Sequence, residues 1–222
     1  MPEIATILYR RATFGPAPGQ AAALAAASRD FASEGFFEYH LYTLQRPATL
    51  MNNETKQIEL ARSSDVPVRK VFIYNGSAAS QGNYFNEYTQ TDPNYGISSE
   101  KKVWVMLEFR NSKENNLGLP MPKGKIRVYK QDTDDSLEFV GEDLIDHTPK
   151  DEDVRIKMGN AFDVVGERTR TNFQISTDRK SMTESFQIKI KNHKSEVITV
   201  KVVEPLYRWS NWRVLESSQK FT

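Results

Sequence analysis

The chain has 222 residues, no cysteine, and 30 basic against 29 acidic side chains, for a net charge of +1. Without cysteine it forms no disulfide and offers no thiolate for metal binding or nucleophilic attack. Charges of both signs are interspersed and no apolar run approaches the roughly 20 residues of a membrane helix, so nucleic-acid binding and a membrane span are not indicated. A mean hydropathy of −0.60 favours antiparallel sheets with one solvated face.

The first 14 residues form an arm with a short apolar pattern. Its apolar members, which we take as candidate assembly residues, are Ile4, Ile7, Leu8 and Tyr9. A docked arm of this kind adds as a strand to a sheet edge, either of a neighbouring subunit or of its own domain, and both alternatives are open. Its two arginines follow after only a few apolar residues, which is unlike a cleaved signal peptide.

A glycine- and proline-rich break at residues 15–19 separates the arm from an alanine-rich segment, residues 20–31. Because alanine is the strongest helix former, we expect a short helix near residues 21–31. A helix this short is marginal on its own, so a flexible linker is the alternative.

Residues 36–75 alternate apolar and polar side chains in three runs, each followed by turn-forming residues. Such alternation predicts half-buried strands, here at residues 38–44, 56–60 and 68–74. Proline ends the first run, and Asn52-Asn53 and Asn75-Gly76 supply turns.

This stretch resembles a known family. The text EYHLYTLQRPATLMNNETKQIELARSSDVPVRKVFIYNG, followed by NLGLPMPKGKIRVYKQD, FVGEDLIDHTPKDEDVRIKMGNAFDVVGERT and IKNHKSEVITVKVVEPL, is similar to the C-terminal domain of mucoidy-inhibitor-A-like proteins, catalogued as domain of unknown function 4139. The resemblance runs from about Gly35 to the end of the sequence. It implies a place in the cell envelope or outside the cell, and it supplies no catalytic residues.

Residues 77–99 are rich in Gly, Ser, Asn and Tyr and are expected to form a long loop, the kind of segment that often carries function. Its tyrosines Tyr84, Tyr88 and Tyr95 either pin the loop to the sheet, which we favour, or form an interaction surface.

The remaining sequence predicts a series of strands separated by turns. Residues 102–110 are apolar on both faces, which indicates a central strand. Residues 124–131 and 137–144 are expected to pair as a hairpin, and so are residues 182–192 and 196–203. Further strands are expected at residues 154–158, 162–165 and 169–177. This density favours an antiparallel β-sandwich, immunoglobulin-like over residues 99–222, preceded by strands and the Tyr-rich loop in residues 36–98 and by the arm and linker in residues 1–35.

No catalytic, cofactor or metal motif emerges from the remaining chemistry. His40, His147 and His193 lack the spacing of a helical metal site. The acidic run at residues 132–135 lacks the glycine and distal glutamate of a calcium loop, so a solvated hairpin tip is the favoured interpretation. The acid pairs Glu142/Asp143 and Asp151/Asp153 are more typical of charged turns than of a glycosidase.

Two tryptophans near the end, Trp209 and Trp212, are either buried over the sheet, which we favour, or exposed to stack on sugar. We therefore expect a non-enzymatic structural or interaction module of the cell envelope or surface, assembling through the arm into a homo-oligomer or filament or binding another envelope protein. A carbohydrate-binding module and a hydrolase with an unrecognised site are the alternatives. A cytoplasmic place stays open.

Overall fold

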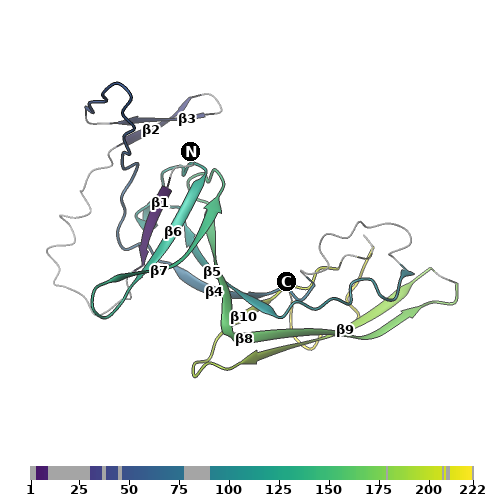
Figure 1. Cartoon of the computed structure of the whole chain (residues 1–222). Helices are drawn as coiled ribbons and strands as arrows, with labels where there is room; N and C mark the ends of the chain where they lie inside the picture. Colours follow the sequence, from purple (N-terminus) through teal and green to yellow (C-terminus); the bar gives the residue numbers. More distant parts are fainter. Residues whose placement is uncertain are drawn as a thin grey trace. The chain divides into compact units, whose positions relative to one another are not determined.

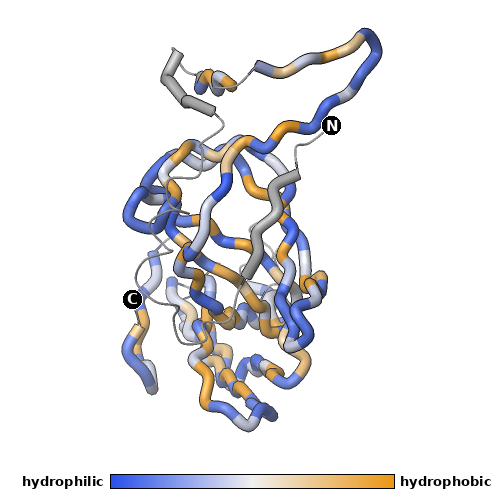
Figure 2. The backbone as a smooth tube through the Cα atoms, turned by 90° about the vertical axis from the view of Figure 1, so that its left-hand side faces the viewer, coloured by the Kyte–Doolittle hydropathy of each residue, from blue (hydrophilic) through white to orange (hydrophobic). Residues whose placement is uncertain are grey.

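The computed structural model describes residues 4–9, 31–36, 39–44, 47–77, 91–178, 180–206, 208 and 211–221. The described chain is mainly β, as predicted, with almost no helix (Figure 1). Along the tube of Figure 2, apolar and polar residues interrupt one another at short intervals, the pattern that strands with two unlike faces require.

The strands in the described ranges form three sheets. A three-stranded sheet has the order β1 (Ile4–Tyr9), β6 (Gly124–Gln131) and β7 (Leu137–Ile145). A five-stranded sheet has the order β10 (Val200–Val202), β4 (Arg69–Tyr74), β5 (Lys102–Arg110), β8 (Asp153–Ile175) and β9 (Met182–Asn192). The third is the antiparallel pair β2 (Phe31–Phe36) and β3 (Tyr39–Leu44).

The chain divides into two compact units, each built from two segments: Met1–Lys70 with Met106–Met158, and Val71–Val105 with Gly159–Thr222. The buried core of the first unit contains Phe109, Ile126, Val128, Ile145, Val154 and Ile156. The buried core of the second contains Phe72, Tyr74, Val103 and Val164. The domain boundaries inferred from sequence, after residues 35 and 98, stay a prediction.

Several strands lie where the alternation places them. Strands β5, β6 and β9 have the predicted bounds, β3 confirms the run at residues 38–44 over its described part, and β7 pairs with β6 as the expected hairpin. Strand β5 is central, between β4 and β8. In β6 the alternation is fully expressed, because Ile126 and Val128 are each 1 % exposed while their neighbours are not buried.

Other predictions are wrong. The three strands expected between residues 154 and 177 are one continuous strand, β8, in which Gly159 adopts φ of 137° and so carries the chain through without a turn. Residues 56–60 form no strand, although they alternate. Of residues 196–203 only Val200–Val202 form a strand, and β10 pairs in parallel with β4 instead of returning along β9.

The architecture is also not purely antiparallel, since β1 with β6 and β10 with β4 are parallel pairs. Parallel strands are joined by a long crossover connection and not by a short turn. Turn residues between neighbouring runs therefore do not indicate which strands pair in parallel. The helix expected near residues 21–31 lies outside the described residues, except for Phe31, which begins β2.

Candidate interaction sites

The arm forms a strand at one edge of the three-stranded sheet. Strand β1 pairs in parallel with β6 over six consecutive Cα partners, from Ile4 opposite Lys125 to Tyr9 opposite Lys130. All four candidate assembly residues, Ile4, Ile7, Leu8 and Tyr9, fall within this ladder. Strand β6 is anchored independently of β1, because its inward side chains lie in the unit's core and β7 pairs with its other side. Its β1 side carries the arm in a parallel ladder, the kind of pairing by which extended segments bind sheet edges.

The sheet edges at β7, β9 and β10 are less suited to accept a strand. Strand β10 is only three residues long, and β9 exposes polar side chains that include Lys189 and Lys191. Strand β7 carries a register shift opposite Val128/Tyr129 and exposes Glu138. Short length, charged side chains and bulges are the features by which sheet edges avoid pairing. Strand β6 also carries charged side chains, but it is eight residues long, its Lys125 and Arg127 pair with Glu142, and its free side holds the arm.

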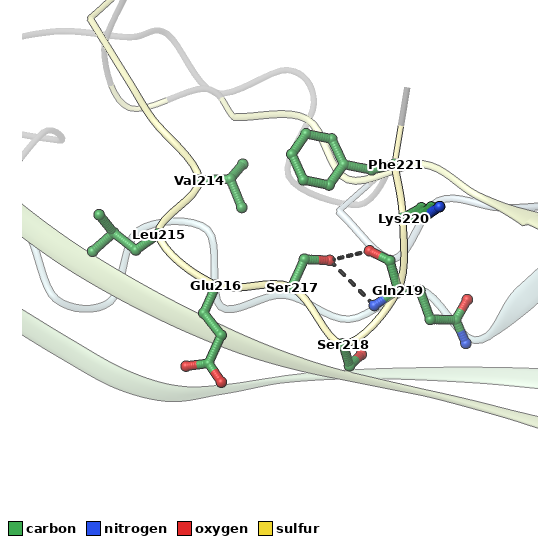
Figure 3. Close-up of a pocket in the computed structure, with 8 residues that line it drawn as sticks. All are labelled: Val214, Leu215, Glu216, Ser217, Ser218, Gln219, Lys220 and Phe221. Atoms are coloured by element: carbon green, nitrogen blue, oxygen red, sulfur yellow. Dashed lines mark hydrogen bonds between the residues drawn. The ribbon is translucent and has the colours of Figure 1, made fainter.

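The described C-terminal segment exposes apolar side chains. Trp212 is 57 % exposed, so the favoured prediction that it is buried is wrong. Residues 214–221 curl around an open surface hollow in which Ser217 Oγ donates a hydrogen bond to the carbonyl of Gln219 at 2.6 Å (Figure 3). The hollow is lined by this one segment, which makes it a local turn with no groups converging from other elements.

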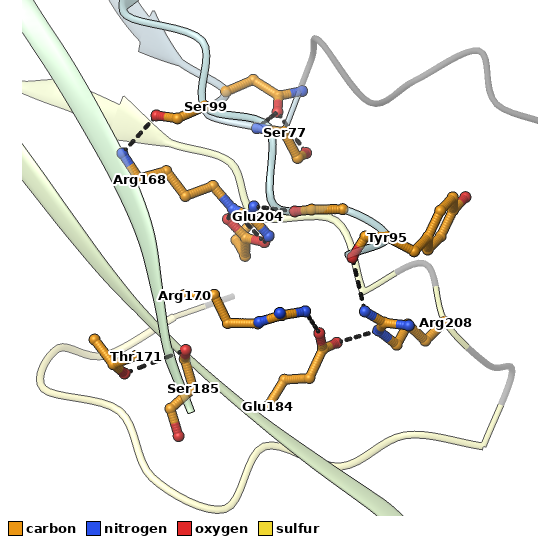
Figure 4. Close-up of polar contacts among 12 residues, drawn as sticks. Ser77, Tyr95, Ser99, Arg168, Arg170, Thr171, Glu184, Ser185, Glu204 and Arg208 are labelled. Atoms are coloured by element: carbon orange, nitrogen blue, oxygen red, sulfur yellow. Dashed lines mark hydrogen bonds and ion pairs between the residues drawn. The ribbon is translucent and has the colours of Figure 1, made fainter. Parts of the chain in front are cut away.

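The second unit contains a buried arginine cluster that the sequence analysis did not identify. Arg168 on β8 has a fully buried side chain, and its Nε and Nη2 bind both carboxylate oxygens of Glu204 at 2.6–3.1 Å (Figure 4). Its Nη1 donates to the carbonyl of Gly96 at 2.6 Å, and its guanidinium lies 3.8 Å from the centroid of the Phe186 ring. A buried arginine requires such partners, because removing its charge from water is otherwise very costly.

A second group of charges lies beside this pair. Glu184 on β9 binds two arginines, Arg170 at 3.5 Å and Arg208 at 2.7 Å (Figure 4). Arg208 also donates to the carbonyls of Tyr95 and Asp92. The cluster thereby fastens the end of the Tyr-rich loop and the segment after β10 to strands β8 and β9.

The backbone at Gly166 and Gly76 lies close to the side chain of Tyr74, beside the arginine cluster. The ring of Tyr74 lies so near Gly166 that a Cβ there would be 1.9 Å from it, and a Cβ on Gly76 would be 2.7 Å from the Tyr74 hydroxyl. That hydroxyl donates to the carbonyl of Glu100 at 2.8 Å. Burial raises the pKa of Tyr74 despite the hydrogen bond with Ser99 and the nearby charge of Arg168, so the ring stays a neutral donor. The Tyr74 hydroxyl thus holds the backbone at Glu100 through a neutral hydrogen bond.

The first unit has a smaller charge cluster on β4, β5 and β8. Glu108 is 14 % exposed and lies 2.6 Å from guanidinium nitrogens of both Arg69 and Arg155. Burial alone would raise the pKa of Glu108, but the hydrogen bonds from the two arginines lower it overall. The carboxylate is held ionised between two exposed cations.

The remaining predicted residues are placed as follows. Tyr95 is half-buried and carries the Arg208 guanidinium 5.5 Å from its ring centroid, a position that pins the loop. Tyr84, Tyr88 and Trp209 lie outside the described residues.

The histidines and acid pairs are dispersed over turns and strands. His40, His147 and His193 are all exposed, and within the described ranges no three potential ligands gather in a way that would hold a metal ion. Residues 132–135 form the expected hairpin tip, in which Asp132 and Asp134 accept backbone hydrogen bonds.

The acid pairs have local partners. Glu142 pairs with Lys125 and Arg127, Asp143 accepts the backbone N–H of Lys157, and Asp153 lies 3.6 Å from Arg110. These interactions fit charged strand faces and turns.

One sequence signal did point to the arginine cluster. Val164, Gly166 and Arg168 follow one another at a two-residue spacing, and all three are buried on β8. An arginine in phase with inward-facing residues must have an acidic partner. The sequence does not indicate which acidic residue pairs with Arg168, since Glu204 lies 36 residues further along the chain.

The chain matches no known family model, no curated protein and no solved structure. In the part of the chain that the structure describes, no helix has the length and apolar character needed to cross a membrane.

Proposed function

We propose that the chain is a non-enzymatic structural or interaction module that takes up an extended strand at the edge of β6. The observation that supports this most strongly is the β1–β6 ladder, in which a strand from the start of the sequence is held at the edge of a sheet whose other strands come from residues 124–145. Backbone pairing supplies affinity in such sites, and alternate side-chain positions supply selectivity.

The resemblance to mucoidy-inhibitor-A-like proteins supports a place in the cell envelope or at the cell surface. We propose on the same ground that the strands are arranged as a sandwich with an immunoglobulin-like part in residues 99–222. Burial of Phe109, Ile126, Val154 and Ile156 in one core, drawn from β5, β6 and β8, is the contact pattern that supports packing of β6 on the larger sheet.

The acceptor edge is tested with a chain lacking residues 1–14 and a fluorescently labelled peptide of residues 1–14. We expect saturable 1:1 binding by anisotropy, and no binding by a peptide of the same composition in scrambled order. Absence of binding by a truncated chain that circular dichroism shows to be folded would refute the proposal. The full chain is the matched control, because its edge is already paired.

A carbohydrate-binding module is the second candidate, and the exposure of Trp212 favours it. An exposed indole offers a flat apolar face on which a sugar ring stacks. Screening the full chain and Trp212→Ala on a glycan array tests this candidate. Binding that Trp212→Ala loses with an unchanged melting transition supports it, and absence of binding by the unaltered chain rejects it.

A further inference from the structure

This inference rests on the proposed function and names the partner at the β6 edge. We propose that β6 accepts β1 of a second copy of this chain, and that two copies exchange these strands reciprocally to form a closed dimer.

Exchange conserves every pairing of the β1–β6 ladder. The six Cα partners from Ile4/Lys125 to Tyr9/Lys130 are the same whether β1 comes from its own chain or from another. The free energies of the two arrangements therefore differ only in the connecting segment and in the concentration of chains. Exchange of an identical element is a low-cost route to dimers for this reason.

Strand β1 pairs with its unit through a single ladder and is far from the next strand in sequence. As the outermost strand of its sheet, β1 has one neighbour. Residues 10–30 separate it from β2, and these 21 residues span up to about 70 Å when extended. Their sequence includes Gly15, Pro16, Pro18 and Gly19, residue types that favour a break between regular elements.

Each copy has one donor strand and one β6 edge, so two copies satisfy both donors and both edges without leaving either unpaired. Strand β10 is only three residues long and β9 exposes Lys189 and Lys191, so neither edge of the five-stranded sheet competes with β6 for the donor strand. A closed dimer is therefore favoured over an open filament.

Cysteine crosslinking tests the exchange, because the chain has no native cysteine. Thr6 and Arg127 are Cα partners, and neighbouring strands lie about 4.8 Å apart, within the range that a disulfide bridges. Chains carrying only Thr6→Cys and chains carrying only Arg127→Cys, one of them with a size tag, are mixed, unfolded, refolded together and oxidised. Exchange predicts a crosslinked dimer that contains one chain of each kind.

The matched control mixes Thr6→Cys with Thr133→Cys, which lies at an exposed hairpin tip of the same unit. A dimer yield no higher than this control, together with intrachain crosslinking alone in the Thr6→Cys/Arg127→Cys double variant at every concentration, would overturn the exchange. Peptide binding by the truncated chain would survive that result, so the two proposals fail separately. Crosslinked species of the double variant that extend beyond a dimer would overturn the closed form.

Discussion

Replacing Glu204 by leucine removes the partner of the most deeply buried charge that the structure describes. Arg168 is fully buried, whereas Glu204 retains 20 % exposure. In Glu204→Leu the guanidinium loses its three hydrogen bonds to the carboxylate, while the hydrogen bond to the Gly96 carbonyl and the contact with the Phe186 ring remain. The charge cannot be relieved by deprotonation, because arginine does not lose its proton in proteins.

The expected loss of stability differs between the two single variants, because Arg168 is fully buried and Glu204 is partly exposed. Leaving a buried charge without its partner costs about 3–5 kcal/mol of unfolding free energy, so we expect a loss of that size for Glu204→Leu. Arg168→Met fills similar space and leaves Glu204 able to reach water, so we expect a smaller loss of about 1–3 kcal/mol. The double variant should be more stable than the sum of the single losses predicts, with a coupling energy of about 2 kcal/mol.

Urea unfolding followed by circular dichroism measures the four proteins of this cycle. Glu142→Leu is the control, since its partners Lys125 and Arg127 are partly exposed and its loss should change stability little. A loss below about 1 kcal/mol for Glu204→Leu, or strictly additive losses in the double variant, would refute the view that the buried pair is coupled.

Three further predictions follow from single sites. Gly166→Ala places a methyl group within the ring of Tyr74 and should lower stability by about 3 kcal/mol or more in a urea titration; an unchanged midpoint would show that the two do not touch. In Gly159→Ala the added methyl group meets no atom within 4 Å, but alanine is forced to φ of 137°. We expect the free energy of unfolding to fall by about 1–3 kcal/mol in the same titration, and a gain in stability would contradict backbone strain at this position. Because the pKa of Glu108 is lowered on folding, its stabilisation is present above its ordinary pKa of 4.5 and is lost as the pH falls through the folded value. The stability difference between the native chain and Glu108→Gln should shrink below pH 4.5, and a constant difference across this range would contradict it.

Alternation with clear turn residues was enough to predict the local strands. In β6 the pattern Gly-Lys-Ile-Arg-Val-Tyr-Lys-Gln is bounded by prolines before and an acidic turn after, and the structure starts and ends the strand at the predicted residues. The pairing of β6 with β7 was also predicted correctly, because the two strands of a hairpin are adjacent in sequence.

Alternation failed where pairing is non-local. Residues 196–203 have the pattern of a returning hairpin strand, yet the ladder that forms is parallel to β4, more than 120 residues earlier. No turn dipeptide encodes such a pairing. Residues 56–60 alternate but form no strand. An alternating run becomes a strand only where a neighbouring strand pairs with it, and the run itself does not encode that neighbour.

The candidate sites, the arm and the arginine cluster, could be predicted only in part from the sequence. The apolar pattern of Ile4–Tyr9 predicted a strand at a sheet edge, and the edge that it occupies, β6, became known only from the register. Arg168 and Glu204 are separated by a strand pair and a loop, and their meeting depends on how those elements pack.

Hydrogen–deuterium exchange across Gly124–Gln131 tests most directly whether β6 presents an edge that the arm covers. In a chain lacking residues 1–14, the amides of β6 should exchange faster than in the full chain, while those of β9 in the other unit stay unchanged. Addition of the peptide of residues 1–14 should restore the protection. Equal exchange of β6 in the two chains, or no effect of the peptide, would contradict the account.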